Sequence, residues 1–133
     1  MPQASPHVMV FGTFDLLHEG HRFVFREAMK RGRVTVIVAN DANVTKIKGR
    51  KPVEDQRVRL NKIQSEFPEL RVFIGDSKDF LQPLREHKPD LILLGYDQRL
   101  PPGIEEKDLT CDVLRLPALD PHLYKSSLMR ERD

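Results

Sequence analysis

Five short runs of apolar residues recur along the chain, and they limit its possible folds more than any other feature. Each run is rich in Val, Ile or Leu and shows no strict apolar–polar alternation. Runs of this kind are typical of strands buried on both faces, as in a parallel sheet. We therefore predict strands at VMVF (8–11), VTVIVA (34–39), VFI (72–74), LILLG (91–95) and VLRL (113–116).

Segments with helical periodicity lie between these runs. Apolar side chains recur at helical spacing in residues 19–31, 54–67 and 78–87, and Pro68 marks the end of the second segment. Strands that alternate with helices indicate an α/β fold with a doubly wound parallel sheet and right-handed crossovers. The length of 133 residues fits a single domain with one core. We expect residues 1–6 to form a flexible tail ahead of that domain.

Composition argues against two classes of partner. The chain has 22 basic and 20 acidic residues, and the resulting net charge of +2 is too small to indicate nucleic-acid binding. No apolar run approaches the roughly 20 residues that span a bilayer, and the first residues, MPQASPH, lack the pattern of a signal peptide. The single cysteine, Cys111, cannot form an internal disulfide, so a reducing compartment is the simplest one. We therefore expect a cytoplasmic protein without nucleic-acid or membrane partners.

The segment GTFDLLHEGH (12–21) connects the first predicted strand to the first predicted helix. In α/β proteins this edge of the sheet is where ligands bind. Gly12 allows a ligand to approach the backbone, and the amides of Thr13 and Phe14 are then placed to point at a phosphate. The segment matches neither the P-loop nor the dinucleotide-binding fingerprint.

Two histidines, His18 and His21, lie near the start of this helix, and Gly20 leaves space between them. Two imidazole donors at a helix N-terminus suit a phosphate whose negative charge increases in a transition state. Alternatively, a histidine here is a helix cap or a surface residue. A metal pair is disfavoured because it usually needs spacing i, i+4 and a third ligand. Asp15 either contacts a substrate or makes a capping or structural hydrogen bond.

The HEGH sequence resembles the HxGH motif of the nucleotidyltransferase superfamily, and GTFDLLHEGH is similar to the form found in its cytidylyltransferase-like branch. This resemblance implies a Rossmann-like sheet of five parallel strands. It also implies that His18 and His21 bind the phosphates of a nucleoside triphosphate and stabilise the pentacoordinate transition state at the α-phosphorus. The residues that the resemblance assigns to nucleotide binding in this segment are Gly12, Thr13, Phe14, His18, Glu19, Gly20 and His21.

The resemblance continues after the second strand, in ANDANVTKIKGRKP (39–52). This segment is similar to a family loop that holds an acidic residue, matched by Asp41, and a triphosphate-binding lysine, matched by Lys46. Alternatively, KIKGRK is a solvated basic loop, as most charge runs are. In EDQR (54–57), Arg57 matches a family arginine near the acceptor substrate, and its alternative role is a surface salt bridge.

Two later segments complete the match. In KPDLILLGYDQ (88–98), Asp97 takes the position of a nucleotide-binding aspartate, with a simple loop turn as the alternative. YKSSLMR (124–130) stands where the family has a serine- and threonine-containing signature, but it lacks the leading arginine and the threonines of the RTxGISTT form. The residues predicted here are Tyr124, Ser126 and Ser127 for the nucleotide and Arg130 for the substrate, and Ser126 is alternatively a helix cap.

The combination of KIKGRKP, EDQR and KPDLILLGYDQ is most similar to the archaeal FAD synthase group. That resemblance implies transfer of AMP from ATP to FMN. We expect direct in-line displacement, with Mg²⁺ or another divalent cation bound with the triphosphate and held by few protein ligands. The resemblance also implies a homodimer. Two alternatives stay open: a cytidylyl- or adenylyltransferase for glycerol 3-phosphate or a sugar phosphate, and a non-catalytic nucleotide-binding module.

Overall fold

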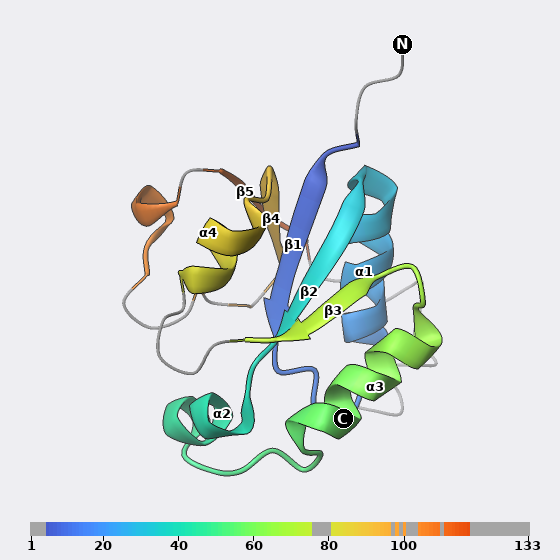
Figure 1. The fold of residues 1–133 in the computed structure, drawn as a ribbon, viewed down its shortest axis with the longest axis vertical. Coiled ribbons are helices and arrows are strands. Elements are labelled where there is room, and N and C mark those ends of the chain that lie inside the picture. The colour runs from blue at the N-terminus through green and yellow to red at the C-terminus, as the bar shows by residue number, and fades with distance from the viewer. Residues whose placement is uncertain are drawn as a thin grey trace.

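Five parallel strands form one sheet in the order β3-β2-β1-β4-β5 (Figure 1). The structure is a computed structural model that describes residues 5–75, 81–96, 98, 100, 104–109 and 111–117. The order reverses direction at β1, as expected for a doubly wound sheet, and the predicted α/β fold with five parallel strands is confirmed. The strands are β1 (His7–Gly12), β2 (Arg33–Val38), β3 (Arg71–Ile74), β4 (Leu91–Leu94) and β5 (Asp112–Arg115).

Four helices and a short 3-10 helix connect these strands in the described part of the chain. None of the described helices is long and apolar enough to cross a bilayer. In Figure 1, α4 lies on the opposite side of the sheet from α1. The elements are α1 (Glu19–Arg31), α2 (Asp41–Lys48), α3 (Gln56–Glu66), α4 (Gln82–His87) and η1 (Glu106–Asp108).

Helix α2 occupies a segment that we predicted as a loop, and its two ends explain why it forms. Asn40 is its N-cap, because the Asn40 Oδ1 accepts a hydrogen bond of 2.8 Å from the Asn43 N–H. Gly49 ends the helix in the left-handed region at φ 78°, where glycine carries no steric penalty. Because only Asn43 and Val44 of the helix are buried, its apolar pattern was too short to reveal it.

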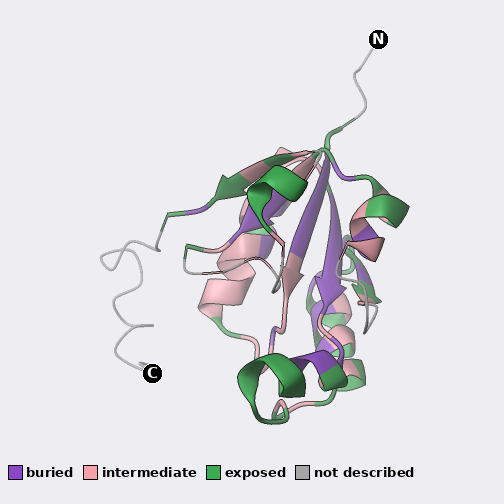
Figure 2. Cartoon of the chain, turned by 90° about the vertical axis from the view of Figure 1, so that its left-hand side faces the viewer, coloured by how far each residue is buried: buried purple, intermediate pink, exposed green. Residues whose placement is uncertain are grey.

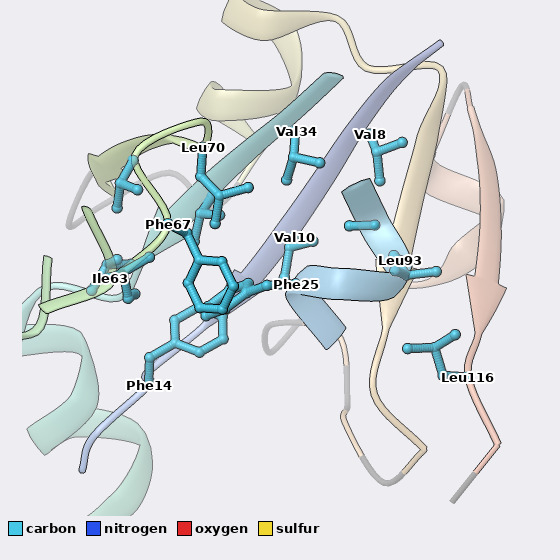
Figure 3. Packing of buried hydrophobic residues seen from close by; sticks show 14 residues of the cluster. Val8, Val10, Phe14, Phe25, Val34, Ile63, Phe67, Leu70, Leu93 and Leu116 are labelled. Atoms are coloured by element: carbon cyan, nitrogen blue, oxygen red, sulfur yellow. The ribbon is translucent and has the colours of Figure 1, made fainter. Parts of the chain in front are cut away.

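The hydrophobic core lies between the sheet and helices α1 and α3, and it extends to the β1–α1 turn. The Phe25 ring from α1 lies 5.0 Å from the Phe14 ring of that turn and 5.3 Å from the Phe67 ring at the end of α3 (Figure 3). All three side chains are buried, and burying each stabilises the fold by about 1.5–3 kcal/mol. The turn is therefore attached to the core through Phe14.

The carboxyl ends of the strands meet at one edge of the sheet. Gly12 pairs with Val38 at the ends of β1 and β2, and the Ala39 N–H donates to the Gly12 carbonyl at 2.9 Å. The segments that follow β1, β2 and β4 therefore lie side by side. At the opposite edge, the Pro6 carbonyl accepts from the Arg33 N–H at 2.9 Å, while residues 1–4 of the predicted tail lie outside the described residues.

Candidate active site

The turn between β1 and α1 is built around a left-handed residue whose side chain folds back over the strand. Phe14 has φ 56°, and its ring lies over Gly12, where an added Cβ would stand 2.5 Å from the Phe14 Cζ. We expected the missing side chain at Gly12 to admit a ligand. The structure shows that Gly12 is also needed for the Phe14 ring to reach the core.

The two histidines of the motif form a capping box at the N-terminus of α1. His18 is the N-cap, and its Nδ1 accepts from the Gly20 N–H at 3.1 Å. In return, the His21 Nδ1 accepts from the His18 N–H at 3.3 Å. The rings stack with centroids 3.8 Å apart and planes 21° from parallel. Because each Nδ1 accepts from a backbone amide, each neutral imidazole carries its proton on Nε2 and presents that nitrogen as a donor.

Gly20 makes this arrangement possible. A Cβ at this position would lie 3.0 Å from the His18 Cε1 and 3.1 Å from the His18 Nδ1, too close for the observed ring position. The adjacent Glu19 carboxylate pairs with Arg22 at 3.1 Å and with Arg26 at 3.6 Å along the helix. Because His18 and His21 lie at the N-terminus of α1, their Nε2–H donors stand at the positive end of the helix dipole.

His21 is a neutral donor at physiological pH. Burial, followed by the His18 ring and the charges of Arg22 and Lys48, lowers the pKa of His21 to about 3. The edge-to-face contact with the Phe14 ring, at 5.3 Å between centroids, contributes to that apolar environment. The His21 ring therefore acts on an anion through its N–H dipole and not through a positive charge.

Asp15 makes structural hydrogen bonds and does not cap α1. Its two carboxylate oxygens accept from the Val53 N–H at 2.8 Å and from the Glu54 N–H at 2.9 Å. Burial alone would raise the pKa of Asp15, but these two amides, together with the charges of Arg59 and Lys48, hold the pKa below its usual value. Of the roles we considered, the structure supports the structural one, which attaches the β1–α1 turn to the segment that precedes α3.

Helix α2 presents positive charge next to this turn. Lys46 and Lys48 lie in its last turn, and Arg50 and Lys51 follow; all four are exposed. Figure 2 shows most of this helix in the colour of exposed residues. Lys48 is close enough to lower the pKa of His21, which places the end of α2 near the histidine pair. The predicted lysine is thus carried by a helix and not by a loop.

The predicted acidic residue of this region, Asp41, is engaged by an arginine that sequence reasoning missed. The Asp41 Oδ1 pairs with the Arg59 Nη2 at 2.7 Å, and Arg59 is fully buried. The predicted Arg57 is exposed at the start of α3. The signal that would have found Arg59 is its spacing, because it lies four residues before Ile63 on the buried face of the helix.

Asp97, Tyr124, Ser126, Ser127 and Arg130 lie outside the described residues. Gln98, next to Asp97 in the sequence, joins β1 to the segment that follows β4: its Nε2 donates to the Phe11 carbonyl at 2.6 Å, and its Oε1 accepts from the Gly95 N–H at 3.1 Å.

The described residues thus gather most of the predicted site at the carboxyl edge of the sheet. The predicted residues of segment 12–21 form one turn, while Asp41 and Lys46 belong to the neighbouring helix α2, which Arg59 joins to that turn through Thr13. Among the described residues, no three His, Cys, Asp or Glu side chains cluster as a metal site.

Comparison with protein families identifies one match over most of the chain. The model of the cytidylyltransferase-like family matches residues 9–132. The FAD synthase of Methanosarcina mazei is 41% identical over 116 residues, which cover 83% of this chain and 76% of the relative. The FAD synthase of Methanoculleus marisnigri is 39% identical over 132 residues, which cover 94% of this chain and 87% of the relative.

A solved structure shares the architecture as well. The crystal structure of a lipopolysaccharide core biosynthesis protein from Thermoplasma volcanium superposes with a TM-score of 0.75 at 31% sequence identity. The match covers 88% of this chain and 100% of that chain. The family match over residues 9–132 therefore includes the β1–α1 turn and α2.

Proposed function

Because the chain belongs to the cytidylyltransferase-like family of nucleotidyltransferase enzymes, we propose that it transfers AMP from ATP to FMN and releases pyrophosphate. The observation that carries nucleotidyl transfer is the histidine capping box, which fixes two Nε2–H donors at the N-terminus of α1. The choice of FMN and ATP rests on the relatives named FAD synthase, which are 41% and 39% identical over most of the chain.

In this proposal the reaction is a direct in-line displacement. A terminal phosphate oxygen of FMN attacks the α-phosphorus of ATP, a new P–O bond forms, and the bond from the α-phosphorus to the α–β bridging oxygen breaks. Pyrophosphate leaves with the electron pair, so FAD and pyrophosphate account for all atoms. The nucleophile is already an anion and needs no general base, so catalysis rests on positioning and electrostatics.

The imidazoles of His18 and His21 donate to the non-bridging oxygens of the α-phosphate, where negative charge increases in the transition state. Because the capping box holds both rings before substrate arrives, little reorganisation is needed at the moment of reaction. The helix dipole of α1 adds to the same field.

The remaining predicted residues surround this centre. Lys46, on the exposed end of α2, interacts with the β- and γ-phosphates and stabilises the leaving pyrophosphate. Proposed contacts with the nucleotide involve Gly12, Thr13, Phe14, Glu19, Gly20, Asp97, Tyr124, Ser126 and Ser127, and proposed contacts near the acceptor involve Asp41, Arg57 and Arg130.

A divalent cation, Mg²⁺ or another, accompanies the triphosphate in this proposal and neutralises phosphate charge when bound. The described carboxylates nearby have other partners: both oxygens of Asp15 accept backbone amides, and one oxygen of Asp41 pairs with Arg59. A cation held chiefly by phosphate oxygens and water fits this set of residues, since Mg²⁺ usually retains several waters.

The test is to incubate the protein with Mg²⁺, FMN and either ATP or CTP and to separate the flavins by chromatography. We expect FAD with ATP, together with an equal amount of pyrophosphate. Riboflavin in place of FMN is the matched control, because it lacks the attacking phosphate. Absence of FAD with every divalent cation tried would contradict the choice of acceptor.

A second acceptor class is favoured by one specific observation, the likeness to the lipopolysaccharide core biosynthesis protein of T. volcanium. Such a name points to carbohydrate chemistry, so a sugar phosphate or glycerol 3-phosphate is the second candidate. Pyrophosphate release with one of these phosphates and not with FMN would assign the chain to that reaction.

We further propose that the protein acts in the cytoplasm, as its single cysteine suggests, and, from the family resemblance, that it is a homodimer. Light scattering coupled to size-exclusion chromatography measures the mass directly, and a value near 15.4 kDa, the mass of one chain, would contradict the dimer.

A further inference from the structure

Arg59 is the largest fully buried side chain among the described residues, and the displacement mechanism has no use for it. A buried charge is unfavourable unless it is paired and hydrogen-bonded. Helix α3 places it inside because Asp55 caps the helix and the next positions on the inner face are Arg59 and Ile63. A buried guanidinium at the carboxyl edge of the sheet therefore needs an explanation.

The Arg59 guanidinium joins segments that follow two neighbouring strands. Its Nη1 donates to the Thr13 carbonyl after β1 and to the Ala39 carbonyl after β2, both at 2.8 Å. Its Nε donates to the Glu54 carbonyl at 2.9 Å, and its Nη2 pairs with the Asp41 carboxylate at 2.7 Å. One planar group thus fixes the β1–α1 turn relative to the start of α2.

The bond to Thr13 also determines where the next amide points. In a planar trans peptide the C=O and the following N–H point in opposite directions. Since the Thr13 carbonyl points inward to Arg59, the Phe14 N–H points away from it. Within the described part of the chain this N–H has no hydrogen-bond acceptor, and the Phe14 ring contacts the ring of His21.

We propose that Arg59 is a positioning residue that orients the Thr13–Phe14 peptide so that the Phe14 N–H binds a phosphate oxygen beside the histidine pair. This inference rests on the proposed nucleotidyl transfer but not on the identity of the acceptor. Arg59 does not contact the substrate; it acts through a backbone amide that would otherwise be free to rotate toward another partner.

Lysine is the informative substitution at this position. Arg59→Lys keeps the charge opposite Asp41, but an ammonium group lacks the planar fork that holds the Thr13 and Ala39 carbonyls together. Arg59→Gln serves as a second variant. Arg31→Lys is the matched control, because Arg31 pairs with Glu27 at 3.1 Å in the last turn of α1, far from the carboxyl edge of β1.

The direct readout is the Phe14 amide signal in the full-length protein labelled with ¹⁵N-phenylalanine. The chain has seven phenylalanines, and Phe14→Tyr identifies the signal by its loss. Inorganic pyrophosphate, the leaving group of every nucleotidyl transfer, is the probe, and calorimetry confirms that it binds. We expect pyrophosphate to shift the Phe14 signal in the wild type and in Arg31→Lys, but not in Arg59→Lys.

Turnover gives the second readout. We expect Arg59→Lys to reduce kcat by about 10²-fold, as for the loss of one oxyanion donor, with a smaller change in the KM for ATP. The proposal would be overturned if the wild-type Phe14 signal does not shift when pyrophosphate binds. It would also be overturned if folded Arg59→Lys shows the same Phe14 shift as the wild type. Failure of both Arg59 variants to fold, judged by circular dichroism, would assign Arg59 to the fold alone.

The outcomes for this inference and for the proposed function are separable. If FMN gives no FAD but pyrophosphate still moves Phe14 in an Arg59-dependent way, the positioning role stands and only the acceptor is wrong. If pyrophosphate does not bind at all, the role of the Phe14 amide is overturned, while FAD formed from ATP and FMN would still support the proposed transfer.

Discussion

Histidines stand at both ends of the central strand region, and they are used differently. At the amino end of β1, the His7 Nε2 lies 2.7 Å from the Thr35 Oγ1, both side chains are buried, and the His7 N–H donates to Asp90. At the carboxyl end, His18 and His21 engage backbone amides through Nδ1 and carry their protons on Nε2.

This difference shows how a structural histidine is distinguished from a candidate catalytic one. The His7 Nε2 is hydrogen-bonded to Thr35 on the neighbouring strand, and this bond joins β1 to β2 inside the fold. In the capping box, the Nδ1 of each histidine accepts from a backbone amide, and Nε2–H is the proposed donor to the substrate. We therefore expect substitutions of His18 and His21 to lower turnover, and substitution of His7 to lower stability.

The largest expected effect is on turnover at the carboxyl end. His18→Asn and His21→Gln keep side chains that act well at the N-cap and N3 positions of a capping box, so helix α1 should stay stable. Each variant removes one imidazole donor, and we expect kcat to fall by about 10²–10³-fold. Steady-state assays of pyrophosphate release measure this. Near-normal kcat in either variant, at saturating substrate, would mean that the imidazoles are not transition-state donors.

A smaller effect is expected at Lys46. Lys46→Ala should weaken ATP binding more than AMP binding, because a lysine that faces the β- and γ-phosphates has nothing to hold in AMP. A hydrogen bond to a charged group contributes about 1.5–3 kcal/mol, so roughly a tenfold or greater loss is expected for ATP. Calorimetric titration with both nucleotides measures it. Lys30→Ala is the control, since Lys30 pairs with Glu27 on α1. Equal losses of affinity for ATP and AMP would show that Lys46 does not contact the β- and γ-phosphates.

Much of this comparison was readable from the sequence because its signals are local. Strand runs and helical spacing gave the five parallel strands, and the segment 12–21 located the histidines at a strand-to-helix turn. The family resemblance of that segment is confirmed by the match over residues 9–132. Local patterns succeed here because the central strands β1, β2 and β4 are largely buried and the motif is contiguous.

The supports of the site could not be predicted in the same way. Asp15 binds the amides of residues 53 and 54, and Arg59 binds carbonyls at residues 13 and 39. These contacts join segments far apart in the sequence, and the residue types involved do not predict them. The spacing to Ile63 places Arg59 on the inner face of α3, but an arginine in a polar stretch usually points to solvent, so its burial was not predicted.

At the amino end the expected effect is on stability. His7→Ala removes the partner of a buried hydroxyl at Thr35, which should lower the free energy of unfolding by about 1–3 kcal/mol. Urea unfolding followed by circular dichroism measures this difference. Because the site lies at the other edge of the sheet, kcat at 25 °C should stay near that of the wild type. A large loss of kcat in folded His7→Ala would break the distinction between the two ends.

The smallest expected effect is a pH dependence of stability, to which His21 and His7, at opposite edges of the sheet, both contribute. Burial lowers the pKa of His21 to about 3 and also lowers the pKa of His7, from an ordinary value of 6.5 in the unfolded chain. Between those values the unfolded state binds protons that the folded state does not, so the stability present above pH 6.5 is lost as the pH falls. After allowance for solvent screening, we expect about 1 kcal/mol less stability at pH 5 than at pH 7 from His21. Urea midpoints at the two pH values measure this loss, and His21→Gln should show a smaller one than the wild type. A pH dependence between pH 5 and pH 7 that is unchanged in both His21→Gln and His7→Gln would show that neither imidazole is held neutral by the fold.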